Sequence, residues 1–232
     1  AREALKISPR FVPAMNNLGV GFIKEGSYQE AAEHLRKAVQ LSPGDVISHY
    51  YLGVSLYYIG DIDGSVREFQ EALRLNPHHQ GAQKGLQLAY SNQKKIDHTI
   101  SQLEEALRVQ PDDPVLHYKL AELFAQKGAT GAAIDHCERA LSLAPKAMRV
   151  LHTLSVLYAR EGRADDAISS LKRMARIDPD NPDIDYNMAC VYSRQGHADE
   201  SLWHLQQAGR KGFNNMSLLR TDPDLAAIRE LK

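Results

Sequence analysis

The sequence is poor in cysteine and lacks long apolar runs. Only two cysteines, Cys137 and Cys190, occur in 232 residues, which excludes the disulfide framework of small secreted domains. No apolar stretch is long enough to cross a bilayer, and no signal pattern opens the chain. The net charge of -1 gives the chain as a whole no attraction to nucleic acid or anionic lipid. We therefore expect no nucleic-acid partner and no direct membrane insertion.

The chain opens with Ala1 rather than Met. We expect either a fragment of a longer protein or a product whose leader has been removed. The composition is that of a soluble protein and leaves its compartment open, either the cytoplasm or, after leader removal, an exported location.

Catalytic and metal-binding motifs are also missing. There is no glycine-rich phosphate loop, no nucleophile elbow and no paired cysteine spacing for zinc. The acidic run 178–185 lacks the central glycine and the final glutamate of a calcium loop. Its Asp and Asn residues instead suit tight turns and a helix N-terminus. We therefore expect no enzyme activity, no metal and no cofactor.

The most informative feature is a repeat with an interval of 34 residues. An interval of this size is typical of helical arrays. One large apolar column contains Leu18, Leu52, Leu86, Leu120, Leu154 and Met188. Small residues dominate a second column, Ala38, Ala72, Ala106, Ala140, Met174 and Ala208. A third column marks the end of each unit with Pro43, Pro77, Pro111, Pro145 and Pro179.

Leu-Gly, an aromatic or apolar residue, Gly, Ala, a second apolar residue, Ala and Pro follow one another in a fixed order in these units. This order resembles the tetratricopeptide repeat, and the resemblance covers nearly the whole chain. It implies an all-α fold, namely a right-handed superhelical solenoid of helix-turn-helix repeats with a C-terminal capping helix. The family says much about shape and little about the partner.

The repeat interval predicts the following division of the chain: the second half of a truncated repeat at 1–11, six repeats at 12–45, 46–79, 80–113, 114–147, 148–181 and 182–215, and a capping segment at 216–232. The third repeat is degenerate, because Lys94 replaces the turn glycine and Gln87 replaces a small residue. The truncated repeat would leave one helix face without a partner in the chain.

Local signals predict how the helices begin and end. Gly26 should end a helix in the left-handed conformation, and Ser27 should cap the next one. Asp61 should open the second helix of its repeat. Asp222 should cap a final helix whose Leu225, Ile228 and Leu231 cover repeat six.

We expect structural rather than chemical roles for the histidines and cysteines. His34, His136 and His204 share one column, and whole repeats separate each from the next, which is too far for a common metal ion. We expect these three histidines on a solvated helix face. His49 and His117 should be partly buried between helices. Cys137 lies in an apolar column and should be a core residue, whereas Cys190 should face the binding groove described next.

In the tetratricopeptide family, the first helix of each repeat lines a concave surface that commonly holds peptides. By register, this resemblance assigns a partner-binding groove to Asn16, Asn17, Tyr50, Tyr51, Tyr57, Tyr58, Lys84, Tyr118, Lys119, Arg149, His152, Arg160, Tyr186, Asn187 and Arg194. Basic residues outnumber acidic ones on this surface, and tyrosine is favoured at binding hot spots. The expected partner is therefore a peptide or protein with acidic and apolar residues. The four tyrosines of repeat two could equally fill gaps between helices.

Two specialised functions of the family do not carry over. Repeats one to three, with Asn16, Val20, Tyr51 and Gly85, do not supply the Lys and Asn set of a carboxylate clamp. Only Asn17 and Asn187 match the asparagine ladder of protein O-glycosyltransferases.

We therefore expect a non-catalytic scaffold for protein-protein interaction. One alternative is a structural protein that stacks end to end through its open half-repeat, as a homo-oligomer or filament. Another is the C-terminal interaction arm of a larger enzyme.

Overall fold

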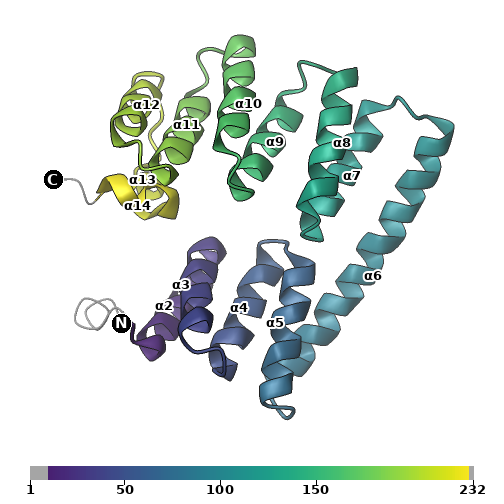
Figure 1. Cartoon of the computed structure of the whole chain (residues 1–232), viewed down its shortest axis with the longest axis vertical. Coiled ribbons are helices and arrows are strands. Elements are labelled where there is room, and N and C mark those ends of the chain that lie inside the picture. The colour runs from purple at the N-terminus through teal and green to yellow at the C-terminus, as the bar shows by residue number, and fades with distance from the viewer. Residues whose placement is uncertain (1–9, 230–232) are drawn as a thin grey trace. The chain divides into compact units, whose positions relative to one another are not determined.

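The computed structural model describes residues 10–229, and no strand occurs within that range. Its α-helices are α2 Val12–Glu25, α3 Tyr28–Leu41, α4 Val46–Tyr58, α5 Ile62–Leu75, α6 Gln80–Val109, α7 Pro114–Gln126, α8 Thr130–Leu143, α9 Met148–Arg160, α10 Ala164–Ile177, α11 Pro182–Arg194, α12 Ala198–Arg210, α13 Met216–Thr221 and α14 Ala226–Arg229 (Figure 1). A 3-10 turn, η1, spans Pro223–Leu225. The expected all-α repeat solenoid is confirmed. Residues 1–9 of the predicted half-repeat, and Leu231 of the predicted cap, lie outside the described residues.

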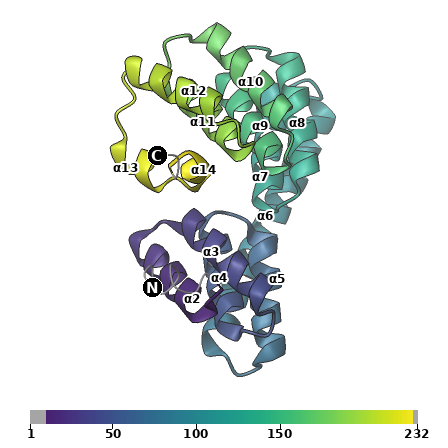
Figure 2. The same cartoon turned by 60° about the vertical axis from the view of Figure 1, so that its left-hand side comes forward.

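The chain divides into two compact units. The first unit consists of residues 1–102 and 123–129, and the second consists of residues 103–122 and 130–232. Figure 2 shows the helices of each unit from a second direction. Within the second unit, α9 packs against both α8 and α10, and α11 packs against both α10 and α12. Each helix pair therefore covers the pair before it, which is how a repeat array distributes its core.

Glycines in the left-handed conformation close the turns within the helix pairs. Gly26, at the end of α2, has φ 79°, where a side chain would be strained. The backbone N–H groups of Gly26 and Ser27 donate to the carbonyls of Ile23 and Phe22 at 3.1 and 2.9 Å. Ser27 occupies the N-cap position of α3 as predicted, but its hydroxyl makes no capping hydrogen bond. Asp61 does cap α5, since its carboxylate accepts the N–H of Gly64 at 2.8 Å.

The third repeat is not a helix pair. A single helix, α6, runs for 30 residues through the place where the other repeats turn. The residue at that place is Lys94, and lysine favours a helix interior and disfavours the left-handed turn. Gly81 and Gly85 do not break α6. A Cβ atom on Gly85 would lie 2.5 Å from Cζ of Phe69, so the absence of a side chain lets the ring lie against the helix.

The two helices of each of the first two repeats also touch where the first helix carries glycine. A Cβ on Gly19 would lie 2.6 Å from Cγ of Leu35, and one on Gly53 would lie 2.8 Å from Cδ1 of Phe69. Alanines that recur at the 34-residue interval are fully buried: Ala31, Ala38, Ala72, Ala133, Ala140 and Ala167 each have 0% exposure. Close approach of the helix axes therefore depends on these small residues.

The C-terminal segment folds back onto the last helix pair (Figure 1). Leu225 is 1% exposed and Ile228 is 7% exposed, and both pack with Tyr186, Cys190 and Ala208. The prediction that Leu225 and Ile228 cover repeat six is confirmed.

Two glycines of α2 provide a matched test of this packing. We expect Gly19→Ala to destabilise the chain by about 1–3 kcal/mol, because the added methyl overlaps Leu35. Gly21 has nothing within 4 Å of its Cβ position, so Gly21→Ala should stabilise the chain by about 0.5–1 kcal/mol through helix propensity. Urea unfolding followed by circular dichroism measures both. Equal effects of the two substitutions would contradict the close-packing account.

Candidate functional site: the exposed faces of the first helices

The predicted groove residues lie on α2, α4, α6, α7, α9 and α11. Some of these side chains are exposed to solvent, whereas others pack against neighbouring helices.

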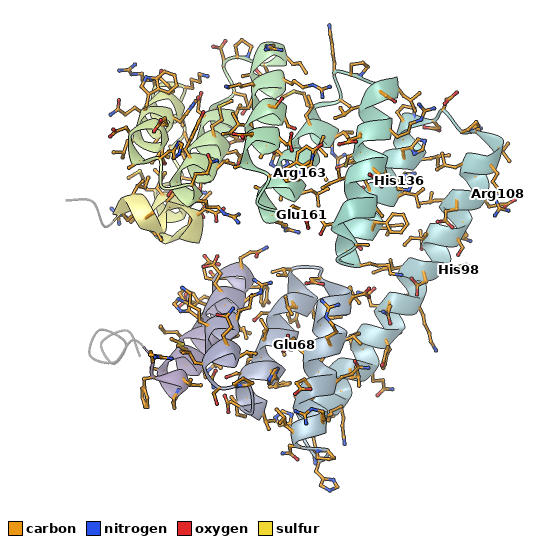
Figure 3. All side chains as sticks on the ribbon, viewed as in Figure 1. Glu68, His98, Arg108, His136, Glu161 and Arg163 are labelled. Atoms are coloured by element: carbon orange, nitrogen blue, oxygen red, sulfur yellow. The ribbon has the colours of Figure 1, made fainter. Side chains whose placement is uncertain are left out.

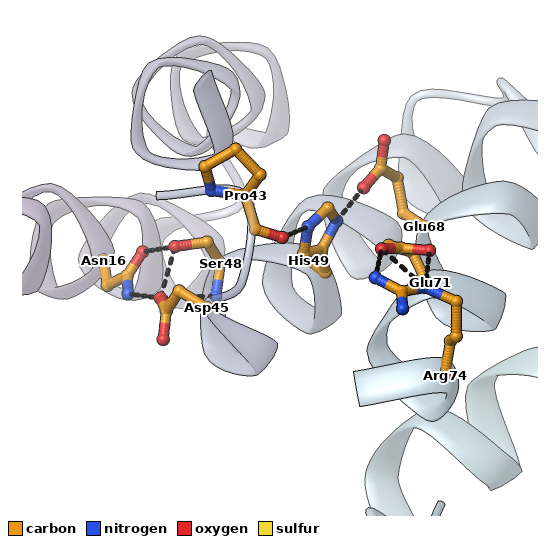
Figure 4. A network of polar contacts seen from close by, with 8 residues as sticks. All are labelled: Asn16, Pro43, Asp45, Ser48, His49, Glu68, Glu71 and Arg74. Atoms are coloured by element: carbon orange, nitrogen blue, oxygen red, sulfur yellow. Dashed lines mark hydrogen bonds and ion pairs between the residues drawn. The ribbon is translucent and has the colours of Figure 1, made fainter. Parts of the chain in front are cut away.

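Asn16 belongs to a polar junction between α2 and α4 (Figure 4). It is 8% exposed, its amide donates to Asp45 at 2.6 Å, and its carbonyl oxygen accepts from the Ser48 hydroxyl at 2.8 Å. Burial would raise the pKa of Asp45, but hydrogen bonds from Ser48 and Asn16 outweigh it and leave that pKa below its usual value. Asn16 is therefore a packing residue, whereas its neighbour Asn17 is exposed.

Three of the four tyrosines on α4 pack within the first unit. Tyr50 lies 6.1 Å from the ring of Phe69 and 4.7 Å from that of His79, and burial raises its pKa. Tyr57 joins the same apolar cluster, and Tyr51 packs on the cluster that contains Leu35. Tyr50, Tyr51 and Tyr57 are half-buried, so packing accounts for much of their surface.

Tyr58 is different, because 59% of its surface is exposed. Its ring stacks on that of Tyr28 at 4.5 Å and an interplanar angle of 12°. Sequence reasoning missed Tyr28, since it begins a second helix and lies outside the groove register. On α6, Lys84 is exposed, and Leu88 is 54% exposed. The exposed predicted residues of the first unit are thus Asn17, Tyr58 and Lys84.

In the second unit, α7 and α9 form a basic face. Tyr118 is half-buried, its hydroxyl lies 3.2 Å from that of Thr153, and the Arg149 guanidinium lies 5.8 Å from its ring centroid. That arrangement is a cation-π contact. Burial raises the pKa of Tyr118, so the phenol stays neutral. The exposed members of this basic face are Lys119, Arg149, His152 and Arg160.

On α11 the C-terminal segment covers part of the predicted groove. Tyr186 is 6% exposed, stacks on Phe213 at 4.5 Å and donates its hydroxyl hydrogen to Asp222. Burial and this bond both raise the pKa of Tyr186. Tyr186 is therefore not available to a partner while the segment is in place.

Cys190 lies under the same segment and does not face an open groove as expected. It is 8% exposed, its thiol lies 3.8 Å from Asp222, and burial raises its pKa. Cys137 is a core residue as predicted, at 0% exposure, and burial raises its pKa to about 12. Arg194 remains exposed beside Asp224 at 3.7 Å, and Asn187 is half-buried.

The histidines of the shared column do not lie on a solvated face. His204 is 2.8 Å from buried Asp185, which also receives Lys211 at 2.6 Å. His34 stacks on Phe22 with ring centroids 5.5 Å apart. The prediction of a solvated face is wrong because this column lies against the preceding helix of the same pair.

His136, on α8 (Figure 3), has its Nδ1 3.1 Å from Nδ1 of His117. The other nitrogen of His117 lies 3.0 Å from the Pro111 carbonyl, which only accepts. Neutral His117 therefore carries its hydrogen on Nε2, and His136 donates to its Nδ1. In the corresponding place of repeat two, Nδ1 of His49 lies 2.6 Å from Glu68 (Figure 4). The same pair of repeat positions thus holds two histidines in repeat four and a histidine with a glutamate in repeat two.

The described residues 10–229 form neither a metal-binding cluster nor a membrane-spanning helix. No group of three or more His, Cys, Asp or Glu side chains in the described part of the chain is arranged to hold a metal ion. None of the described helices combines the length and the apolar character needed to span a membrane.

Four family models match the chain, each described as a tetratricopeptide repeat or TPR repeat. They cover residues 22–60, 46–79, 88–148 and 158–221. No curated protein matches in a sequence search.

Solved structures share the fold. One is YrrB, described as "a TPR protein with an unusual peptide-binding site", with 22% identity, a TM-score of 0.50, and coverage of 82% of this chain and 97% of YrrB. Another is a chain of the "APC/C hetero-tetramer Cut9-Hcn1", with 18% identity, a TM-score of 0.50, and coverage of 100% of this chain and 45% of that chain. At these identities the likeness establishes the fold alone.

The histidine pair predicts a pH effect on stability. Burial and the neighbouring His117 lower the pKa of His136, while Asp135 and Glu104 oppose the shift. The unfolded chain therefore takes up this proton first, and stability is lost as the pH falls below about 6.5. We expect His136→Gln, whose amide can still donate to His117, to lose less melting temperature than the wild type between about pH 7.5 and about pH 5.5.

The matched control is His98→Gln, since His98 is exposed on α6 (Figure 3). That variant should keep the wild-type pH dependence. The same reduced pH dependence in both variants would contradict a role for the buried pair.

Proposed function

Because the chain belongs to the tetratricopeptide-repeat family, we propose that it is a non-catalytic scaffold that binds an acidic peptide or protein segment. The binding surface is the exposed face of the first helices in the second unit. The observation that carries the proposal is the set of exposed cationic or donor side chains on α7 and α9: Lys119, Arg149, His152 and Arg160.

The spacing on α9 supports this proposal. Arg149, His152, Val156 and Arg160 follow one another at intervals of three or four residues, so they share one face of the helix. Val156 is half-buried between the polar residues and would offer an apolar contact. Glu122 on α7, which interacts with Tyr118, is half-buried and therefore adds less negative charge to this face than an exposed glutamate would. The exposed positive charges of Lys119, Arg149 and Arg160 therefore attract acidic partners and repel basic ones.

Contacts within the basic face also restrict the side chains of Tyr118 and Arg149. The hydroxyl of Tyr118 lies 3.2 Å from that of Thr153, and its ring supports the Arg149 guanidinium through the cation-π contact at 5.8 Å. Guanidinium groups bind carboxylates through two parallel hydrogen bonds. A supported guanidinium loses less side-chain entropy on binding than a free one.

The first unit also has exposed side chains that could contact a partner. Tyr58, stacked on Tyr28, and the exposed Leu88 supply aromatic and apolar contact area. Lys84, on the same helix as Leu88, adds one positive charge. These aromatic and apolar side chains suit the apolar residues expected in a partner. The peptide-binding site named for YrrB supports the general use of the fold in peptide capture.

The test is selection from a random peptide library on the immobilised chain, followed by fluorescence anisotropy of the selected peptides. Enriched peptides should be rich in Asp and Glu. The double variant Arg149→Glu with Arg160→Glu should weaken their binding by at least about tenfold, and added salt should weaken wild-type binding.

A matched control places the same charge change on a second helix. Lys172 and Arg176 are exposed on α10, so Lys172→Glu with Arg176→Glu should leave binding nearly unchanged. Equal losses in the two double variants would indicate a general charge effect and contradict this binding face. Selected peptides that are not enriched in Asp and Glu would also contradict the proposal.

A further inference from the structure

The chain carries an acidic segment of its own that is docked on a first helix. Asp222 accepts a hydrogen bond from Tyr186 and lies 3.8 Å from the Cys190 thiol. Two residues later, Asp224 lies 3.7 Å from the Arg194 guanidinium. Tyr186, Cys190 and Arg194 are spaced by four residues along α11 and therefore form one stripe. An Asp-x-Asp segment thus places its two carboxylates at the two ends of this stripe.

The stripe one repeat earlier has the same chemical order. Residues 34 positions before Tyr186, Cys190 and Arg194 are His152, Val156 and Arg160 on α9. Each set offers a ring that donates a hydrogen bond, then a small apolar residue, then arginine. His152 and Arg160 are exposed, whereas Tyr186 and Cys190 are covered.

The first helices of the other repeats do not offer this order. On α7 the corresponding residues are Tyr118, Glu122 and Gln126, and the glutamate repels a carboxylate. On α4 they are Tyr50, Val54 and Tyr58, without a cation. On α2, Asn16 is already bonded to Asp45 and Ser48. On α6 the corresponding residues are Lys84, Leu88 and Asn92, without an arginine at the third position. Among the described first helices, α9 is therefore the exposed counterpart of α11.

We infer that α9 binds a partner segment containing Asp-x-Asp, with one carboxylate at His152 and the other at Arg160. This inference rests on the proposed function and narrows its partner class. A partner segment on α9 could not make the apolar contacts that the C-terminal segment makes on α11. Leu225 and Ile228 pack beside Ala189 and Ala208, and the corresponding side of the α9 and α10 pair is packed by α11. The two carboxylates are thus the recognised feature.

The probe is a fluorescein-labelled peptide with the sequence of residues 218–227, LLRTDPDLAA, and the matched peptide LLRTNPNLAA. We expect the first to bind the full chain and the second to bind at least about tenfold more weakly. Arg160→Glu should also reduce binding of the first peptide by at least about tenfold. Arg194→Glu should preserve it, because the α11 stripe is occupied by the chain itself.

Three results would overturn the inference. Loss of binding in Arg194→Glu but not in Arg160→Glu would mean that the peptide exchanges with the chain's own segment on α11. Equal binding of the aspartate and asparagine peptides would remove the role of the carboxylates. The aspartate peptide could fail to bind while acidic peptides selected from the library bind through Arg149 and Arg160. That result would reject recognition of Asp-x-Asp and leave the proposed function in place. If no acidic peptide binds, the proposed function fails with it.

Discussion

The structure depends on the close approach of paired helices at positions that have no side chain or a very small one. Gly19 lies against Leu35, and Gly53 lies against Phe69, at separations that leave no space for a Cβ atom. Because interiors are packed as densely as organic crystals, these contacts fix how each first helix meets its second. The same contacts decide which faces point inward. The side chains on the remaining face of each first helix are then available for other interactions.

This constraint explains why the sequence predicts the fold so well and the site only in part. Leu52, Leu120 and Leu154 belong to the apolar column with the 34-residue interval and are buried, because each repeat covers its neighbour in the same way. The turn glycines recur for a similar reason, since Gly60 and Gly162 have φ of 88° and 74°. Such positions are set by backbone geometry within one repeat. A pattern of residue types is sufficient to identify them.

The misses have different physical causes. The length of α6 depends on Lys94, which stands at the turn-glycine position and favours a continuous helix over a turn. A repeat alignment shows only that lysine replaces glycine there. The histidine partners depend on contacts across a helix pair, as between His117 and His136. Tyr186 is buried by the C-terminal segment and bonds to Asp222, which is 36 residues away along the chain. Register alone places Tyr186 on the groove face, and it contains no information about which segment folds over that face.

The C-terminal segment also shows how a near-neutral chain can favour one class of partner. Asp222 and Asp224 bring negative charge to the stripe that ends at Arg194, so the chain itself occupies the last basic position. Arg149 and Arg160 on α9 have exposed side chains, and their charge is local to one face. Net charge averages over the whole surface, whereas binding responds to the charge within about one Debye length of the contact, roughly 8–10 Å. Selectivity for an acidic segment therefore requires no excess of basic residues in the chain as a whole.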